Sequence, residues 1–220
     1  MNQMRFDFDF LLRHLPDFVD AVGLALEIFA AATVLALVLS VPLALARLSR
    51  GPVRWIATAY VEFFRNTPLL IQLYFTFFGL PMVGIVFSPF VSGMIALGAQ
   101  HAAFFSEILR GMIQSVASGQ RDAGLALGLT PDAVLRKIVL PQAIRNAIPA
   151  MGGQFVLLLH DTSLVSTIGI MEVTLQGRTL AEQSAASFEM FVTVGAIYLL
   201  LSTGFSIVIS GFERTARYAR

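Results

Sequence analysis

The chain has 220 residues, of which 56% are hydrophobic and 13% are charged, and its formal net charge is +1. Soluble globular domains are roughly 25% charged, so this composition excludes most soluble folds and predicts a membrane protein. The small net charge argues against a nucleic-acid partner held through its phosphates. The absence of cysteine excludes disulfides and thiolate sites, and the three histidines form no HExxH pair that would predict a zinc site.

Apolar stretches long enough to cross a bilayer recur along the sequence, since a membrane helix needs about 20 mostly apolar residues. The uncharged stretch 66–106 exceeds one span, and glycine and proline residues at 79–89 divide it in two. We therefore expect one domain, 1–220, with an all-α fold. This polytopic membrane protein is predicted to have five transmembrane helices, at 20–46, 56–80, 88–110, 142–164 and 189–212.

Arginine and lysine predict the orientation, because they are enriched in cytoplasmic loops. Eleven of the 15 basic residues follow the first span, lie between the third and fourth spans, or close the chain. These are Arg47, Arg50, Arg54, Arg110, Arg121, Arg136, Lys137, Arg145, Arg214, Arg217 and Arg220. The N-terminus is therefore expected outside and the C-terminus in the cytoplasm. Four aspartates in the first twenty residues argue against a secretory signal there.

The segment 111–141 is too polar to cross the membrane and is expected to hold two short helices. Thr130 and Pro131 suit the N-cap and the first position of a helix. Apolar residues then repeat at helical spacing until Pro141, which we expect to end the pattern. Upstream, 119–128 is rich in small residues, which let one backbone approach another surface closely. A docking helix and a helix lying on the bilayer surface both fit this composition.

The same segment resembles the EAA loop of permease subunits in bacterial ABC importers. That loop has Glu-Ala-Ala, three residues, Gly, nine residues and Ile-x-Leu-Pro. Here Asp-Ala-Gly at 122–124 is followed by Gly128 and by Ile-Val-Leu-Pro at 138–141. Three further stretches, at 65–72, 106–111 and 161–164, resemble motifs of the polar amino-acid uptake branch, with His160 where lysine is usual. The resemblance covers about residues 20–215.

This resemblance implies the fold of a type I ABC importer permease in the bacterial inner membrane, and a set of partners. The chain has no GxxxxGK[ST] loop for ATP. ATP and Mg are therefore expected on a cytoplasmic ABC ATPase dimer, and no cofactor on this chain. The other expected partners are the lipid bilayer, a second permease subunit, identical or homologous, and an extracytoplasmic amino-acid-binding protein. The expected ATPase contacts are Gly119, Gln120, Asp122, Ala123, Gly124, Gly128, Leu140 and Pro141.

Polar residues inside the expected spans are candidates for the substrate path, because charges in a membrane are costly. Glu62 and Arg65 lie one turn apart and are placed to form an ion pair. Glu62 and Asp161 either receive the ammonium of an amino-acid substrate, while Arg65 binds the carboxylate of that substrate, or these residues have a structural role. Hydroxyl groups in the fourth span bind either the substrate or their own backbone. The full set is Asp161, Glu62, Arg65, Thr162, Ser163, Gln72 and His160. Outside this set, Glu107 is expected to pair with Arg110.

We therefore expect a permease subunit, itself not an enzyme, that carries a polar amino acid delivered from outside. The alternative is a small channel or ion-coupled carrier that works without an ATPase. A carrier of this kind usually shows internal repeats, which are not evident here. A hydrolase built from His160, Asp161 and Ser163 is disfavoured, because neighbours on one helix point about 100° apart.

Overall fold

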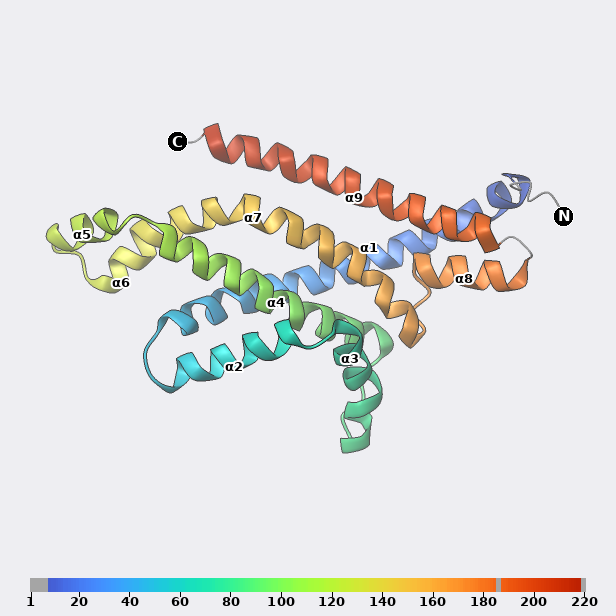
Figure 1. Cartoon of the computed structure of the whole chain (residues 1–220), viewed down its shortest axis with the longest axis horizontal. Helices are drawn as coiled ribbons and strands as arrows, with labels where there is room; N and C mark the ends of the chain where they lie inside the picture. Colours follow the sequence, from blue (N-terminus) through green and yellow to red (C-terminus); the bar gives the residue numbers. More distant parts are fainter. Residues whose placement is uncertain (1–7, 185–186, 219–220) are drawn as a thin grey trace. The chain divides into compact units, whose positions relative to one another are not determined.

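The computed structural model describes residues 8–184 and 187–218, and the regular elements in that part of the chain are all helical (Figure 1). The expected all-α class is confirmed. The α-helices are α1 (Phe8–Leu48), α2 (Pro52–Asn66), α3 (Leu69–Tyr74), α4 (Pro89–Ser115), α5 (Ser118–Ala126), α6 (Pro131–Val134), α7 (Leu140–Asp161), α8 (Val173–Gln183) and α9 (Ser187–Tyr218). Two π turns, Phe75–Gly79 and Leu135–Val139, and two 3-10 helices, Leu80–Val83 and Thr162–Ile168, connect them.

Two of the described helices are each long and apolar enough to cross a membrane: α1 over Leu12–Leu48 and α9 over Ser187–Gly211. Pro131–Ile168 and Val173–Gln183 meet this condition together and are bent by 49°. The count of five spans and the orientation stay predictions. Of the residues used to infer the orientation, Arg220 and the side chains of Arg214 and Arg217 lie outside the described part of the chain.

The expected span 56–80 is not one continuous helix. Helix α2 ends at Asn66, and Thr67 has an extended backbone with φ −106° and ψ 134°. Residues that precede a proline favour this conformation, because the proline ring crowds the helical one. A new helix, α3, begins after Pro68.

The expectation that Pro141 ends a helix is wrong, because Pro141 is the second residue of α7. A π turn precedes it, in which the N–H of Leu140 bonds to the carbonyl of Leu135. Proline has no N–H to continue the usual ladder, and this widened turn lets the helix pass it. The side-chain amide of Gln142 donates to the carbonyl of Ile138 at 2.8 Å and so satisfies one carbonyl in this turn.

The chain divides into two compact units, each with its own apolar core. The first unit comprises the described residues of 8–32, 69–97 and 156–205, and the second those of 33–68, 98–155 and 206–218. In the first, small residues of α1 pack with α8 and α9, and the buried members include Phe18, Ala21, Ala25, Val173, Leu180 and Met190. In the second, the buried members include Ala44, Leu109, Ile113, Val134, Val139 and Ala143.

Candidate coupling loop and substrate path

The loop between α4 and α7 forms two short helical segments in the second unit, α5 and α6, which lie side by side (Figure 1). Helix α5 occupies Ser118–Ala126, close to the expected 119–128. Helix α6 begins at Pro131, and the Oγ1 of Thr130 accepts a hydrogen bond from the N–H of Ala133 at 3.3 Å. The predicted helix start at Thr130 and Pro131 is confirmed.

Gly128 ends α5 through its backbone conformation. Its φ is +80°, in the left-handed region, and a Cβ there would meet no atom within 4 Å. The N–H of Gly128 donates to the carbonyl of Leu125 at 2.9 Å, and the N–H of Leu129 donates to that of Gly124 at 3.2 Å. These bonds form a Schellman motif, in which glycine is preferred because it has no Cβ. The structure thus requires glycine here for its φ, a reason other than the close approach expected from the sequence.

Gly124 is buried against its own chain, and its smallness is needed there. A Cβ at this position would lie 2.7 Å from Cδ1 of Ile138 and 2.9 Å from Cγ2 of Val134. The side of Gly124 on which a Cβ would lie is filled by Val134 and Ile138 of the same chain, and a contact of Gly124 with a partner stays a prediction. The contact holds α5 against that segment, so that the two parts of the loop form one packed body.

Other residues of the expected contact remain on the surface. Gly119, Gln120, Asp122 and Ala123 are exposed on α5, and Leu127, just after it, has 82% of its surface exposed. Of the two residues farther along the chain, Leu140 packs against the core of the second unit and Pro141 is exposed. Helix α5 thus presents small and polar side chains on its outer face, with two large apolar side chains, Leu125 and Leu127, exposed at its end and just after it.

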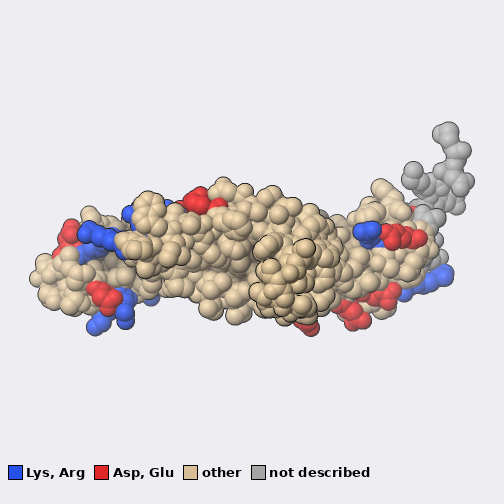
Figure 2. Space-filling model, turned by 90° about the horizontal axis from the view of Figure 1, so that it is seen from below, with Lys and Arg blue, Asp and Glu red and all other residues tan. Residues whose placement is uncertain are grey.

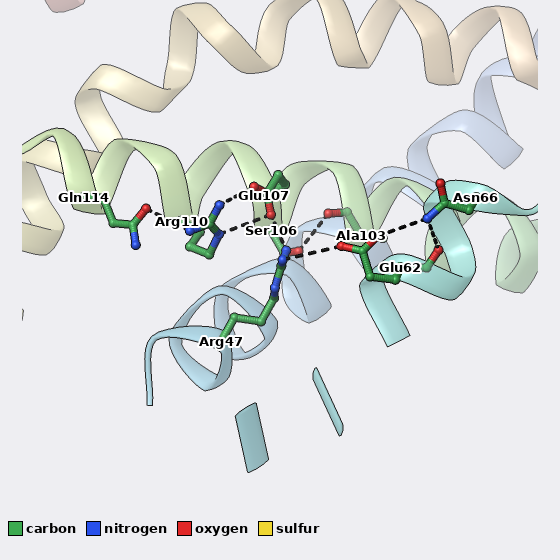
Figure 3. A network of polar contacts seen from close by, with 8 residues as sticks. All are labelled: Arg47, Glu62, Asn66, Ala103, Ser106, Glu107, Arg110 and Gln114. Carbon is green, nitrogen blue, oxygen red and sulfur yellow. Dashed lines mark hydrogen bonds and ion pairs between the residues drawn. The ribbon is translucent and has the colours of Figure 1, made fainter. Parts of the chain in front are cut away.

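A network of charged residues joins α1, α2 and α4 within the second unit (Figure 3). Glu107 of α4 accepts two hydrogen bonds from Arg110, which lies one turn later on the same helix. The Nε of Arg110 is 3.2 Å from Oε2 of Glu107. This i,i+3 pair was predicted and is confirmed. Glu107 also pairs with Arg47, at the end of α1. Sequence reasoning missed Arg47, because the two residues lie 60 positions apart.

Glu62 and Arg65 do not form the expected pair, although the structure describes both residues. The Oε2 of Glu62 accepts from Nδ2 of Asn66 at 3.1 Å, and its Oε1 lies 3.8 Å from Nη2 of Arg47. The guanidinium of Arg65 lies over the ring of Phe104, 5.5 Å from the centroid, in a cation–π contact. Packing between helices therefore separates two side chains that their spacing on α2 would bring together.

The remaining candidates of the substrate path lie in the first unit. Thr162 is fully buried, and its hydroxyl donates to the carbonyl of Leu159 at 2.7 Å, so it bonds its own helix backbone. Asp161 is half-buried as the last residue of α7, and His160 is exposed. The 3-10 helix Thr162–Ile168, which contains Ser163, contacts α3, the helix that carries the buried Gln72.

A buried carboxylate that sequence reasoning missed lies in the same unit. Glu172 is 0% exposed and caps the N-terminus of α8, where its oxygens accept from the N–H groups of Thr174 and Leu175 at 2.9–3.0 Å. The hydroxyl of Tyr198, on α9, donates to the same carboxylate at 2.7 Å. Glu172 lies outside the five expected spans, and burial raises the pKa of its carboxyl, while these hydrogen bonds act in the opposite direction. An acidic residue immediately before a helix was the signal available in the sequence.

Apolar helices long enough to cross a membrane, joined by a packed helical loop, define the class of membrane proteins. Comparison with known families places the chain within that class. The chain belongs to the family described as the binding-protein-dependent transport system inner membrane component, whose sequence profile matches residues 32–218.

Similar proteins have names that refer to amino-acid transport. The chain is 36% identical over 212 residues to the Bacillus subtilis (strain 168) protein named "Probable amino-acid permease protein YxeN", covering 94% of this chain and 95% of that protein. It is 34% identical over 220 residues to the glutamate/aspartate import permease protein GltK of Escherichia coli O6:H1, covering 95% and 97%.

Solved structures show the same fold. A chain from the crystal structure of an amino acid ABC transporter with histidines has a TM-score of 0.91 and 32% identity, covering 96% of this chain and all of that one. A chain of the MetNI methionine ABC transporter has a TM-score of 0.73 at 17% identity, covering 96% and 99%, and supports the fold alone.

Proposed function

We propose that this chain is the membrane-spanning permease subunit of an ATP-driven importer that carries a polar amino acid into the cytoplasm. Membership of a binding-protein-dependent transport family supports this proposal, as do relatives named for amino-acid import. The fold shared with an amino acid ABC transporter supports it further. In this proposal the ATPase dimer, a second permease subunit and an external amino-acid-binding protein are separate chains, and the ATPase binds ATP and Mg.

The observation that carries the proposal is the outer face of α5. Gln120, Asp122 and Ala123 are exposed there, while Gly124 holds the helix against the segment after α6. The inner side of α5 is also tied to α4, because Nη2 of Arg121 donates to the carbonyl of Ile113 at 2.6 Å. A movement imposed on α5 by an ATPase would therefore pass directly to α4. A channel or ion-coupled carrier would have no use for such a connection.

In this proposal each unit has its own candidates for contact with the substrate, and the two sets are considered separately. In the first unit, Asp161 and Ser163 adjoin the turn between α7 and the 3-10 helix. An acidic group there would attract the ammonium of an amino acid. In the second, Arg65 is exposed on α2 and carries the charge that a substrate carboxylate would need.

The docking of α5 can be tested by adding bulk to its exposed face. Ala123→Trp should abolish both co-purification of the ATPase from native membranes and uptake of the amino acid, because the indole holds the two surfaces apart. Ala196→Trp is the matched control, since Ala196 is also exposed but lies on α9, and it should leave both unchanged. If no ATPase accompanies the unmodified chain, even after crosslinking, the proposal fails and the channel or carrier is favoured.

The orientation can be tested directly, because the chain contains no cysteine. Met82→Cys, at a position with 88% of its surface exposed between α3 and α4, should react with a membrane-impermeant maleimide in intact cells. Gln120→Cys, on α5, should react in inverted membrane vesicles only. The reverse pattern would place α5 outside the cell and exclude contact with a cytoplasmic ATPase.

A further inference from the structure

A cavity of about 470 Å³ lies inside the second unit, between the end of α1, the end of α4 and the loop that contains α5 and α6. Its walls are mainly apolar, with Leu48 from α1, Ile113 from α4 and Val134 from α6. Gln114 and Pro131 line it and are exposed, so the cavity opens to the surroundings there. Small-molecule sites typically enclose about 300–1,000 Å³, and this volume lies within that range.

One cationic side chain, Arg121, lines this cavity. It extends from α5 toward α4, and its Nη2 donates to the carbonyl of Ile113. Its Nε is buried and has no hydrogen-bond partner among the residues that the structure describes. A buried donor without an acceptor is costly, and none of the described lining residues is acidic. The cavity therefore offers the positive charge of the Arg121 guanidinium to an anion.

The surroundings of the cavity are basic as well. The segment 110–145 contains five basic and two acidic residues. One of these acids, Asp132, already pairs with Arg136 at 3.1 Å. In Figure 2 the surface at the α5–α6 end carries blue side chains interspersed with red ones, whereas the middle of the molecule is largely tan. This clustering of positive charge would raise the local concentration of anions.

We infer that the cavity binds an anionic phospholipid, with its phosphate at Arg121 and an acyl chain along Leu48, Ile113 and Val134. The inference rests on the proposed function, because it requires α5 at the cytoplasmic interface, where the spans 20–46 and 88–110 end. Basic pockets between membrane helices on that side are typical head-group sites, and guanidinium groups match phosphate oxygens. The apolar wall distinguishes a lipid from free phosphate, which would bury no apolar surface.

A lipid in this position would connect α5 with the end of α1. Leu45 and Leu48 of α1 line one side of the cavity, and Arg121 of α5 lines another. The outer face of α5, which includes Ala123, would stay open for the ATPase. Anionic lipid would therefore stiffen the coupling loop without occupying the surface that contacts the partner.

The test is native mass spectrometry of the purified full chain with equal amounts of dioleoylphosphatidylglycerol and dioleoylphosphatidylcholine. The unmodified chain should retain phosphatidylglycerol in preference. Arg121→Gln should weaken that retention about tenfold, the loss expected for one charge-assisted hydrogen bond. Arg136→Gln is the matched control, because Arg136 is exposed on the same loop and does not line the cavity. Leu135→Trp should also weaken retention, since it fills the apolar part and leaves Arg121 intact.

Equal retention of the two lipids would overturn the inference, and so would equal losses in Arg121→Gln and Arg136→Gln. Inorganic phosphate that competes as strongly as the lipid would assign the cavity to a free anion. If Arg121→Gln no longer co-purifies with the ATPase but retains the lipid unchanged, the cavity would belong to the contact with the ATPase and the inference would be overturned. Because the lipid is counted on the chain alone, a negative result leaves the docking of α5 untouched, and failure of docking leaves the lipid count valid.

Discussion

Two glutamates, one in each unit, have their carboxylates held by different kinds of partner. Glu107 of the second unit is paired with two guanidinium groups, those of Arg47 and Arg110. Glu172 of the first unit accepts from two backbone N–H groups at the start of α8 and from the hydroxyl of Tyr198. Glu107 is thus balanced by formal charges on long side chains, and Glu172 by dipoles at a helix end.

The difference indicates which contacts can rearrange. Arginine side chains have several rotatable bonds and five donors, so the pairs of Glu107 can be exchanged when helices shift. Backbone N–H groups at the start of α8 cannot turn away without unwinding the helix. We therefore expect the cluster of Glu107 to tolerate movement of α1, α2 and α4, and Glu172 to hold α8 and α9 in place.

The largest expected effect comes from removing the carboxylate of the first unit. Glu172→Ala should lower the free energy of unfolding by about 3 kcal/mol, because it removes a helix cap and leaves buried donors unpaired. Unfolding in mixed micelles with increasing sodium dodecyl sulfate, followed by circular dichroism, measures this. Glu182→Ala is the control on the same helix, where the carboxylate is exposed and pairs with Arg178, and it should change stability by less than about 0.5 kcal/mol. Equal effects of the two variants would contradict the structural role of Glu172.

Removing one cation from the other cluster should have a smaller effect. Arg47→Met should cost about 2 kcal/mol, less than a fully buried pair, because Glu107 keeps Arg110 and has 27% of its side chain exposed. Adding Glu107→Gln to this variant should lower stability further, since Arg110 then loses its carboxylate partner. Arg50→Met, at an exposed arginine nearby in the sequence, is the matched control for the same unfolding measurement. A double variant that is as stable as Arg47→Met, or more stable, would refute the charge argument.

Removing the hydroxyl of Tyr198 measures how much it contributes to holding the Glu172 carboxylate, apart from the N–H groups at the start of α8. Tyr198→Phe should cost about 1 kcal/mol, the net value of one hydrogen bond, because Glu172 keeps its two N–H donors. Tyr74→Phe provides the comparison, since Tyr74 is an exposed tyrosine on α3. A loss as large as that of Glu172→Ala would show that the carboxylate depends on the hydroxyl more than on the helix end.

The smallest effect is expected at the edge of the charged network. Glu62→Gln should change stability by less than about 0.5 kcal/mol, because 54% of the Glu62 side chain is exposed and its distance to Arg47 is 3.8 Å. Uptake measured for the same variant tests the substrate path separately. Reduced uptake at unchanged stability would support a role in transport, and unchanged uptake would remove Glu62 from the path.

Local features of the sequence were the ones that predicted structure well. The start of α6 at Thr130 and Pro131, the position of α5 and the Glu107–Arg110 pair depend on residues at most a few positions apart. Such contacts are made within one helix or at its end, so they form whatever the rest of the chain does. The same spacing rule failed for Glu62 and Arg65, because the guanidinium lies over the ring of Phe104 from another helix.

Composition and short-range pattern alone determined that this chain is helical, apolar and suited to a membrane, and the resemblance to the EAA loop added the expectation of a coupling segment. Only the tertiary structure decided that Gly124 faces inward, that Arg47 reaches Glu107 across 60 positions, and that Arg121 lines a cavity. The physical reason is that hydrophobic patterning selects which faces are buried, whereas the partner of a buried polar group depends on which distant helix packs against it.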